Sequence, residues 1–298
     1  MSNLFKFLGA LALSVCATVA SAQTLKPFVL GSKGAGDLAA KVEATKTALT
    51  GAGFTIVGSY SPYADTTILI ATNDELKTTA AKSENGGFGA GQRVSVVKVK
   101  DEVQVSYANP AYWANIYRMS GDLKGTADKL QAALGKVEEF GAKGLTAAEL
   151  RKYHYKMMMP YFDDPDPLVL HASHEDAIKQ VEAGLAAGKQ GVTKVYRIDI
   201  PGKKEVVFGV AMKGTANDKF IDDKFIMGEV DFKDVKSAAH LPYEILVVDR
   251  KVFALSARFR IAASFPDLSM TGDNSFMRIM ESPGAIKKAL AYTAGDKD

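Results

Sequence analysis

The chain has 298 residues, a single cysteine and a formal net charge of +3. Its lysines and acidic residues are interspersed without a basic stripe, which argues against a nucleic-acid-binding protein. The ordinary composition excludes a disordered or fibrous chain, and the length is sufficient for one large domain or two small ones.

Residues 1–22 have the features of an export signal. Lys6 supplies positive charge, an apolar run follows from Phe7 to Val15, and Ala20-Ser21-Ala22 matches the small-x-small pattern of a cleavage site. The apolar run is too short to span a bilayer. The sequence therefore predicts a protein of the periplasm with no integral membrane segment after cleavage. Cys16 leaves with the signal, so we expect no disulfide and no cysteine ligand.

Residues 23–135 are predicted to form a first α+β unit. A helix is expected over residues 37–50, because Leu38, Val42, Thr45 and Leu49 recur on one helical face after Asp37, a good capping residue. The elements expected next are strands over 54–60 and 66–71, a short helix from 73, a glycine-rich loop over 86–91, a hairpin of 93–99 with 103–107, and a helix over 126–134.

Residues 173–298 are predicted to repeat this order. The expected elements are a helix over 174–187, strands over 192–200 and 205–212, a helical segment near 217–225, a hairpin of 243–248 with 252–257, and a helix over 285–292. Residues 96–105 align with 245–254 without a gap. Two similar domains joined by a connecting segment, residues 136–172, are therefore predicted, the alternative being coincidence between two common patterns.

Short motifs in both halves resemble a small bacterial family catalogued as domain of unknown function 302. They are Gly53-Phe54 after the first helix, Val103 to Ser106 followed by Asn109-Pro110, and Leu241-Pro242-Tyr243 before the second hairpin. Tyr243 stands where the family commonly has a cysteine. The resemblance implies two divergent copies of an α+β fold, each a mostly antiparallel sheet with helices packed on it. It implies no activity.

The connecting segment and the residues after it are rich in metal-ligating side chains. Three of the four histidines and a triple methionine fall between His154 and His174. Thioethers suit Cu(I), and imidazole suits copper or haem iron, so we consider a site made by His154, Met157, Met158, His171 and His174. The alternative is that the methionines and the surrounding rings only pack between the two domains. Asp163, Asp164 and Asp166 lack the spacing of a calcium loop and indicate a solvated turn.

A second candidate site follows the first hairpin. Tyr107, Asn109, Tyr112 and Trp113 offer rings and an amide that could line a pocket for a small molecule. Packing in the core is the alternative, because aromatic side chains bury a large area.

The corresponding stretch of the second half contains two arginines. Arg258 and Arg260 alternate with apolar residues, so on a strand they would share one face and could bind an anion. Two solvated arginines are the alternative.

Enzyme motifs are mostly missing from the sequence. There is no Gly-x-Ser-x-Gly elbow, and the glycines from Gly86 to Gly91 lack the dinucleotide-binding spacing. We therefore expect an exported binding or accessory protein that contacts a small molecule or a periplasmic partner protein through the connecting segment. A copper or haem carrier is the alternative, and an enzyme with an unrecognised site is third.

Overall fold

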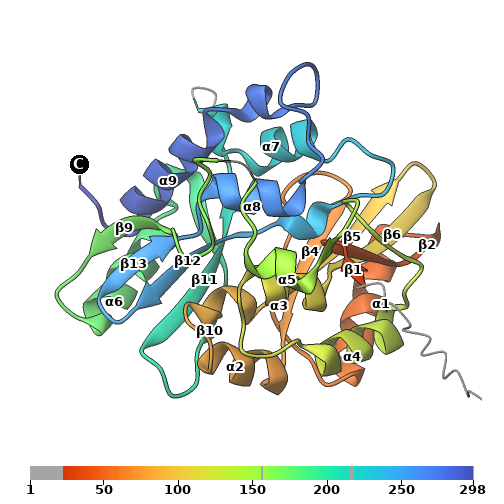
Figure 1. Cartoon of the computed structure of the whole chain (residues 1–298), viewed down its shortest axis with the longest axis horizontal. Coiled ribbons are helices and arrows are strands. Elements are labelled where there is room, and N and C mark those ends of the chain that lie inside the picture. The colour runs from red at the N-terminus through yellow and green to blue at the C-terminus, as the bar shows by residue number, and fades with distance from the viewer. Residues whose placement is uncertain (1–22, 156, 215–217, 298) are drawn as a thin grey trace, which may run out of the picture.

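The computed structural model describes residues 23–155, 157–214 and 218–297. Two antiparallel sheets lie side by side in it (Figure 1). The first contains, in pairing order, β3 (Thr55–Tyr60), β4 (Thr66–Thr72), β5 (Gln92–Val99), β6 (Glu102–Ala108), β2 (Phe28–Ala35) and β7 (Glu138–Phe140). The second contains β10 (Val192–Asp199), β11 (Glu205–Met212), β12 (Tyr243–Val248), β13 (Lys251–Ala254) and β9 (Asp166–Leu170). The short strands β1 (Thr24–Leu25) and β8 (Leu145–Thr146) pair with each other.

Helices cover one face of each sheet. Helices α1 (Leu38–Gly51) and α4 (Lys124–Leu134) pack on the first sheet, and α6 (His174–Ala186) and α9 (Ser282–Thr293) pack on the second. The other helices are α2 (Asp74–Ala81), α3 (Pro110–Ile116), α5 (Ala147–Arg151), α7 (Asp223–Val230) and α8 (Ala257–Ser264). Short 3-10 turns are η1 (Gly86–Gly89), η2 (Lys189–Gly191), η3 (Lys219–Ile221), η4 (Ala238–His240) and η5 (Phe276–Ile279). The predicted α+β class, with antiparallel sheets and packed helices, is confirmed.

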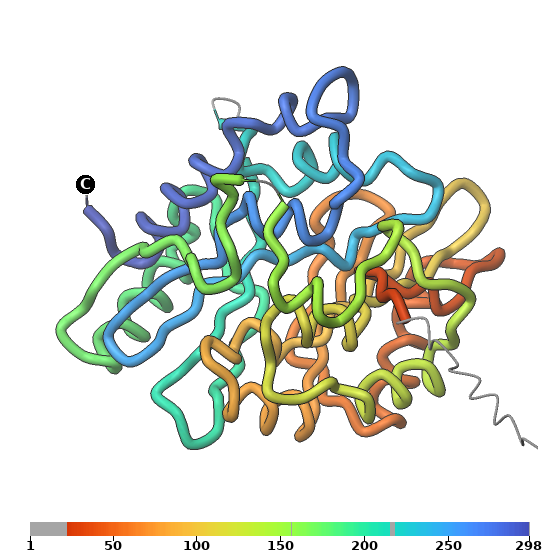
Figure 2. Tube along the Cα trace, in the orientation of Figure 1, coloured from red at the N-terminus to blue at the C-terminus, as the bar shows by residue number. Residues whose placement is uncertain are grey.

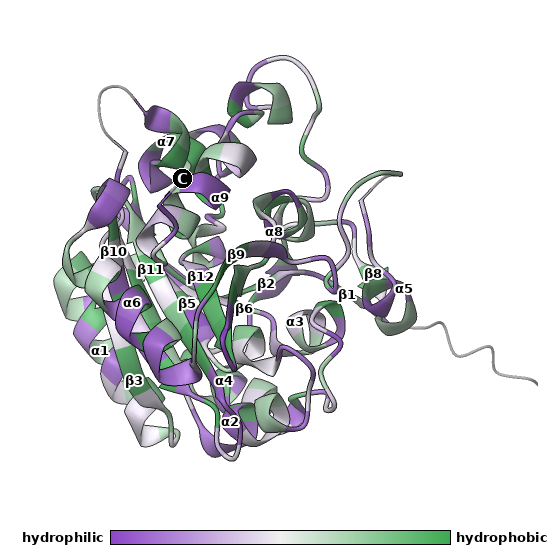
Figure 3. Cartoon of the chain, turned by 90° about the vertical axis from the view of Figure 1, so that its left-hand side faces the viewer, coloured by the Kyte–Doolittle hydropathy of each residue, from purple (hydrophilic) through white to green (hydrophobic). Residues whose placement is uncertain are grey.

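Local sequence rules account for the elements that were predicted. Helix α1 begins after Asp37, whose side chain accepts the Ala40 N–H at 2.8 Å, and it buries Val42, Thr45 and Leu49 as its periodicity requires. Both predicted hairpins are present as β5–β6 and β12–β13. Hydrophobic residues gather on the central strands, while the outer sides of α1 and α6 are more polar (Figure 3).

Several elements depart from the sequence expectations. Strands β1, β2, β7, β8 and β9 and helices α3 and α8 lie where no such element is predicted. Strand β2 is nevertheless internal to the first sheet, between β6 and β7. The connecting segment is also more ordered than a linker. It contributes β7 to the first sheet and β9 to the edge of the second (Figures 1 and 2), so it belongs to both halves.

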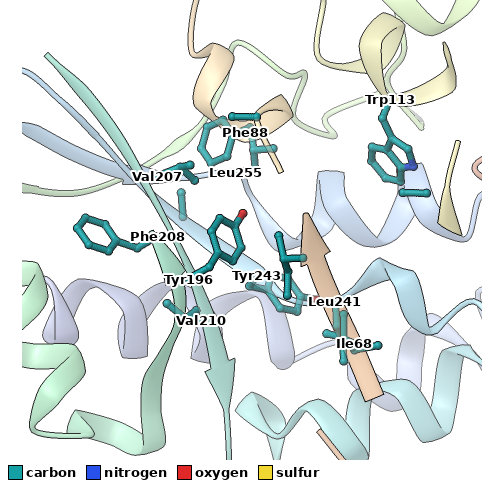
Figure 4. Packing of buried hydrophobic residues seen from close by; sticks show 14 of the residues in the cluster. Ile68, Phe88, Trp113, Tyr196, Val207, Phe208, Val210, Leu241, Tyr243 and Leu255 are labelled. Atoms are coloured by element: carbon teal, nitrogen blue, oxygen red, sulfur yellow. The ribbon is translucent and has the colours of Figure 1, made fainter. Parts of the chain in front are cut away.

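The two halves share one hydrophobic core. The turn η1 of the first half packs on β11 and β12, and η4 of the second half packs on β4, β5 and β6. Ile68 and Phe88 from the first half lie close to Tyr196, Leu241 and Tyr243 from the second (Figure 4). Each half therefore packs a turn on the sheet of the other, and separating the halves would expose the shared core to solvent.

A substitution at Gly87 tests the packing of η1 on β11 and β12. A Cβ atom at Gly87 would lie 2.5 Å from Leu246 Cδ1 and 3.1 Å from Glu205 Oε1, and the Gly87 N–H donates to the same Glu205 oxygen at 2.6 Å. Gly87→Ala should lower the free energy of unfolding by about 1–3 kcal/mol through overpacking, measured by urea denaturation. Gly34→Ala is the control, because no atom lies within 4 Å of the added Cβ. Equal stability of the two variants would contradict this account of the interface.

Candidate functional site

Two histidines of the predicted metal site are bound to backbone. A ring nitrogen of His171 lies 2.9 Å from the carbonyl oxygen of Ala294, and one of His174 lies 2.8 Å from that of Asp249. They tie the start of α6 to the end of α9 and to the β12–β13 turn. Within the described residues, no group of three or more histidine, cysteine, aspartate or glutamate side chains is placed to hold a metal ion.

The rest of the predicted metal site lies in the connecting segment. The ring of His154 lies edge-on to that of Tyr161, with 4.5 Å between centroids. Met157 and Met158 are 86% and 93% exposed. Packing between domains therefore does not account for these two methionines, since an exposed thioether gains little from burial.

The predicted aromatic ligand site is part of the core. Tyr107, Asn109, Tyr112 and Trp113 are all buried. Each donates a hydrogen bond to a backbone carbonyl: Tyr107 to Gly135 at 3.1 Å, Asn109 to Lys26 at 2.9 Å, Tyr112 to Ala263 at 2.7 Å and Trp113 to Pro27 at 2.9 Å. Their polar atoms thus join separate segments of the chain, which matches the packing alternative.

The expectation that Arg258 and Arg260 share one strand face is wrong. Both lie on helix α8, where residues two apart point in different directions. Arg258 is exposed, whereas Arg260 is 1% exposed. Helix α8 is therefore almost wholly buried, and Arg258 is its one residue that is exposed to solvent.

Arg260 belongs to a buried charged cluster between the sheets. It forms an ion pair with Glu244 of β12 and donates to the carbonyl oxygens of His240 and Pro242. Arg93 of β5 lies 3.7 Å from the other Glu244 oxygen. The two halves are thus joined by two cations and one carboxylate, and the carbonyl groups complete the solvation that buried charges require.

His240 lies beside this cluster, and its ring is within hydrogen-bonding distance of two hydroxyl groups, as a catalytic base would be. Its ring nitrogens lie 2.7 Å from Ser264 Oγ and 3.2 Å from Tyr243 Oη. Burial, with Arg260 and Arg93 nearby, lowers the pKa of His240 well below its ordinary value, so the ring is neutral. His240 and Ser264 are both fully buried, so no substrate reaches them and we assign them a structural role.

An apolar pocket of about 230 Å³ lies between the connecting segment and α8. Its walls come from three places: the connecting segment, helix α8 with its C-terminal neighbour Phe265, and the segment from Leu268 to Phe276, which ends in the first residue of η5. The lining residues are Tyr155, Met157, Met159, Arg258, Ile261, Ala262, Phe265, Leu268, Met270 and Phe276. Of the predicted site residues, the pocket includes Met157 and Arg258.

Arg258 also lines a second, more polar hollow. This hollow has a volume of about 490 Å³ and shares Met159 and Arg258 with the apolar pocket. Asp164, Asp166 and Lys287 are among its other lining residues. The guanidinium of Arg258 therefore marks the boundary between an apolar and a polar space.

Comparison of the chain with models of known protein families, with curated proteins and with solved structures finds no match. None of the helices in the described ranges is long and apolar enough to cross a bilayer. The predicted export signal lies outside those ranges.

Two buried carboxylates, Asp223 and Asp231, lie at the two ends of α7 and do not line the apolar pocket. Asp223 is 2% exposed and accepts the Met212 N–H at 3.0 Å. Burial raises the pKa of Asp223 to about 8, which the Met212 hydrogen bond opposes only in part. Burial also raises the pKa of Asp231 to about 7. Both groups are therefore protonated in mildly acidic solution when the protein is folded.

Because of these two carboxyl groups, we expect the free energy of unfolding to fall as the pH rises. Because the folded pKa of Asp223 exceeds the unfolded value of about 3.9, its contribution is complete below pH 4 and is lost as the pH rises towards 8. One such group gives a slope of about 1.4 kcal/mol per pH unit across this range. Asp223→Asn should flatten the dependence of the unfolding free energy on pH between 5 and 8, whereas Asp101→Asn, on an exposed turn, should not. If the unfolding free energy of the wild type, Asp223→Asn and Asp101→Asn varied equally with pH, the raised pKa of Asp223 would be contradicted.

Proposed function

We propose that the chain is an exported binding or accessory protein of the periplasm and that it holds an apolar small molecule in the pocket beneath residues 155–159. The observation that carries the proposal is the pocket itself. It combines an apolar lining with an opening to solvent beside exposed methionines, which is the arrangement of ligand sites in proteins. Methionine side chains adapt to ligand shape because they are unbranched and polarizable.

The pocket wall is anchored on both sides. The Tyr153 hydroxyl donates to the Ala262 carbonyl of α8 at 2.8 Å. Further along, Phe162 is buried against Phe259 and Tyr117, and Asp163 forms an ion pair with Arg118. The described residues between these two anchors, 154, 155 and 157–161, therefore lie beside α8 and are held from both ends. Met157 and Met158 among them are exposed and are not needed for the core.

The two sheets support an origin of the fold by duplication. The strand order β3-β4-β5-β6-β2 corresponds element by element to β10-β11-β12-β13-β9. The two hairpins also place Lys100 and Asp249 at the same turn position with positive φ angles of 56° and 52°. This agrees with the predicted tandem copies of domain of unknown function 302, and we keep that family as a proposal. The anchored loop lies outside the repeated elements, which favours a function of its own.

Filling the pocket tests the proposed function. Ala262 is 7% exposed and lines the pocket from α8, so Ala262→Leu should occupy part of the space without disturbing the helix. The uncharged probe N-phenyl-1-naphthylamine should bind the wild type saturably in a fluorescence titration. The variant should bind it about tenfold more weakly, a loss of about 1.4 kcal/mol.

Ala183→Leu is the matched control, because Ala183 is exposed on α6. It should leave probe binding unchanged. No saturable binding to the wild type, or equal binding to both variants, would contradict a ligand in this pocket.

A copper carrier is the second candidate, and one observation favours it. Met157, Met159 and Met270 line the same pocket, and a set of thioethers is a soft site suited to Cu(I). No described histidine lines this pocket, so the proposed copper site differs from the one expected from sequence, and haem is not favoured.

Anaerobic titration with Cu(I) against a competing chelator tests this candidate. Replacing Met157, Met159 and Met270 together by leucine should abolish binding, because leucine keeps the apolar volume but removes the sulfur ligands. Met277 and Met280 are exposed and lie outside the pocket lining, so their replacement by leucine is the control. The copper candidate fails if the wild type does not compete with a chelator of micromolar affinity.

A further inference from the structure

We propose that the ligand of this pocket is an amphiphile with one alkyl chain and one carboxylate head group, its chain in the pocket and its head group on Arg258. The inference rests on the proposed function and names the class of ligand. It follows from the position of Arg258, the charges around it, and the size and lining of the space beside it.

Arg258 is an exposed cation with no ionic partner among the described residues. Neighbouring basic residues are paired: Lys287 lies 3.4 Å from Asp166, Arg118 lies 2.6 Å from Asp163 and Arg278 lies 3.8 Å from Glu229. Asp164, the other carboxylate in the polar hollow, accepts the Tyr161 N–H at 3.1 Å. Among the described residues that line the apolar pocket and the polar hollow, Arg258 is therefore the cation without a carboxylate partner.

The place of Arg258 on its helix adds to this argument. It is in the first turn of α8, where the partial positive charge of the helix N-terminus makes a cation unfavourable. The Ser256 side chain at the N-cap forms no capping hydrogen bond. A carboxylate beside Arg258 would be attracted by the guanidinium and by the helix terminus together, so a bound anion would relieve an unfavourable arrangement.

The space beside Arg258 fits a single chain. The apolar pocket of about 230 Å³ is smaller than the roughly 300 Å³ typical of the smallest sites for drug-sized ligands. Apart from the Arg258 guanidinium and the Tyr155 hydroxyl, its described lining side chains are apolar, with Ile261, Phe265 and Leu268 among them. An extended alkyl chain is narrow enough for this volume and makes apolar contacts with this lining. Its polar end would lie at Arg258, the charged residue among the described lining residues.

A carboxylate head group suits this cation. A guanidinium presents planar N–H groups that can donate two parallel hydrogen bonds to a carboxylate. Arg258 is exposed on one side to the polar hollow, so a charged head group would keep part of its hydration while the chain leaves water.

Three probes with the same ten-carbon chain separate charge from chain. Decanoate, decanol and decyltrimethylammonium are titrated by calorimetry into the wild type, Arg258→Gln and Arg278→Gln. Decanoate should bind the wild type about tenfold more tightly than decanol, as a partly exposed hydrogen bond between charged groups would give. Arg258→Gln should remove this difference, so that decanoate and decanol bind the variant equally. Arg278→Gln is the control, because it removes a positive charge two residues from the pocket-lining Phe276. It should leave the difference between decanoate and decanol affinity intact.

The outcomes distinguish the two proposals. Equal binding of decanoate and decanol, unaffected by Arg258→Gln, overturns the carboxylate head group and leaves the apolar pocket standing. Absence of binding by all three probes, together with no binding of N-phenyl-1-naphthylamine, overturns the proposed function as well. Binding to phosphatidylglycerol vesicles that depends on Arg258, without binding of decanoate, overturns the single-chain ligand in favour of a membrane surface.

Discussion

The structure depends on the buried ion cluster that joins the two sheets. Arg93 comes from the first half, Glu244 and Arg260 from the second, and all three are almost inaccessible to solvent. Their charges do not cancel, since two cations meet one carboxylate, and the excess is met by backbone carbonyl groups and by the ring of Trp113, 4.5 Å from the Arg93 guanidinium. A shift of one sheet against the other would leave a buried charge without a partner, so the cluster restricts the two halves to one arrangement.

This restriction also fixes the orientation of helix α8. Arg260 is held inside by Glu244 and two carbonyl oxygens, and therefore Arg258 and Ile261 are turned toward the connecting segment. Arg258, Ile261 and Ala262 of α8 line one side of the pocket, and residues of the connecting segment beyond the anchor Tyr153 line another. The proposed ligand site is in this sense a consequence of how the interior charges are satisfied.

Sequence patterns predicted the parts of the fold that local rules determine. The periodicity of α1 and the two hairpins followed from spacing and turn residues. Strand β2 was not predictable in this way, because Gly31, Gly34 and Gly36 are typical of a loop. In the structure Gly31 is required in the strand, since a Cβ atom there would lie 2.7 Å from the backbone oxygen of Leu134. The alternation of Arg258 and Arg260 with apolar residues indicates a strand, but both arginines lie on helix α8, where Arg260 is buried with the other residues and Arg258 is exposed.

The candidate site was predictable only where it lies in the connecting segment. Met157 was identified by composition. Met270 and Phe276 reach the same pocket from the loop before η5 and from the first residue of η5, and no spacing rule relates them to Met157. The charged residues of the core and the charged residue of the candidate site differ in whether their charge is compensated. Inside the protein, ions are compensated at the cost of desolvation, whereas Arg258 lies in the first turn of a helix with no partner among the described residues. Natural sequences depart from such local rules mainly at functional sites, so the uncompensated cation, rather than the density of histidines and methionines, is the stronger guide to what this surface binds.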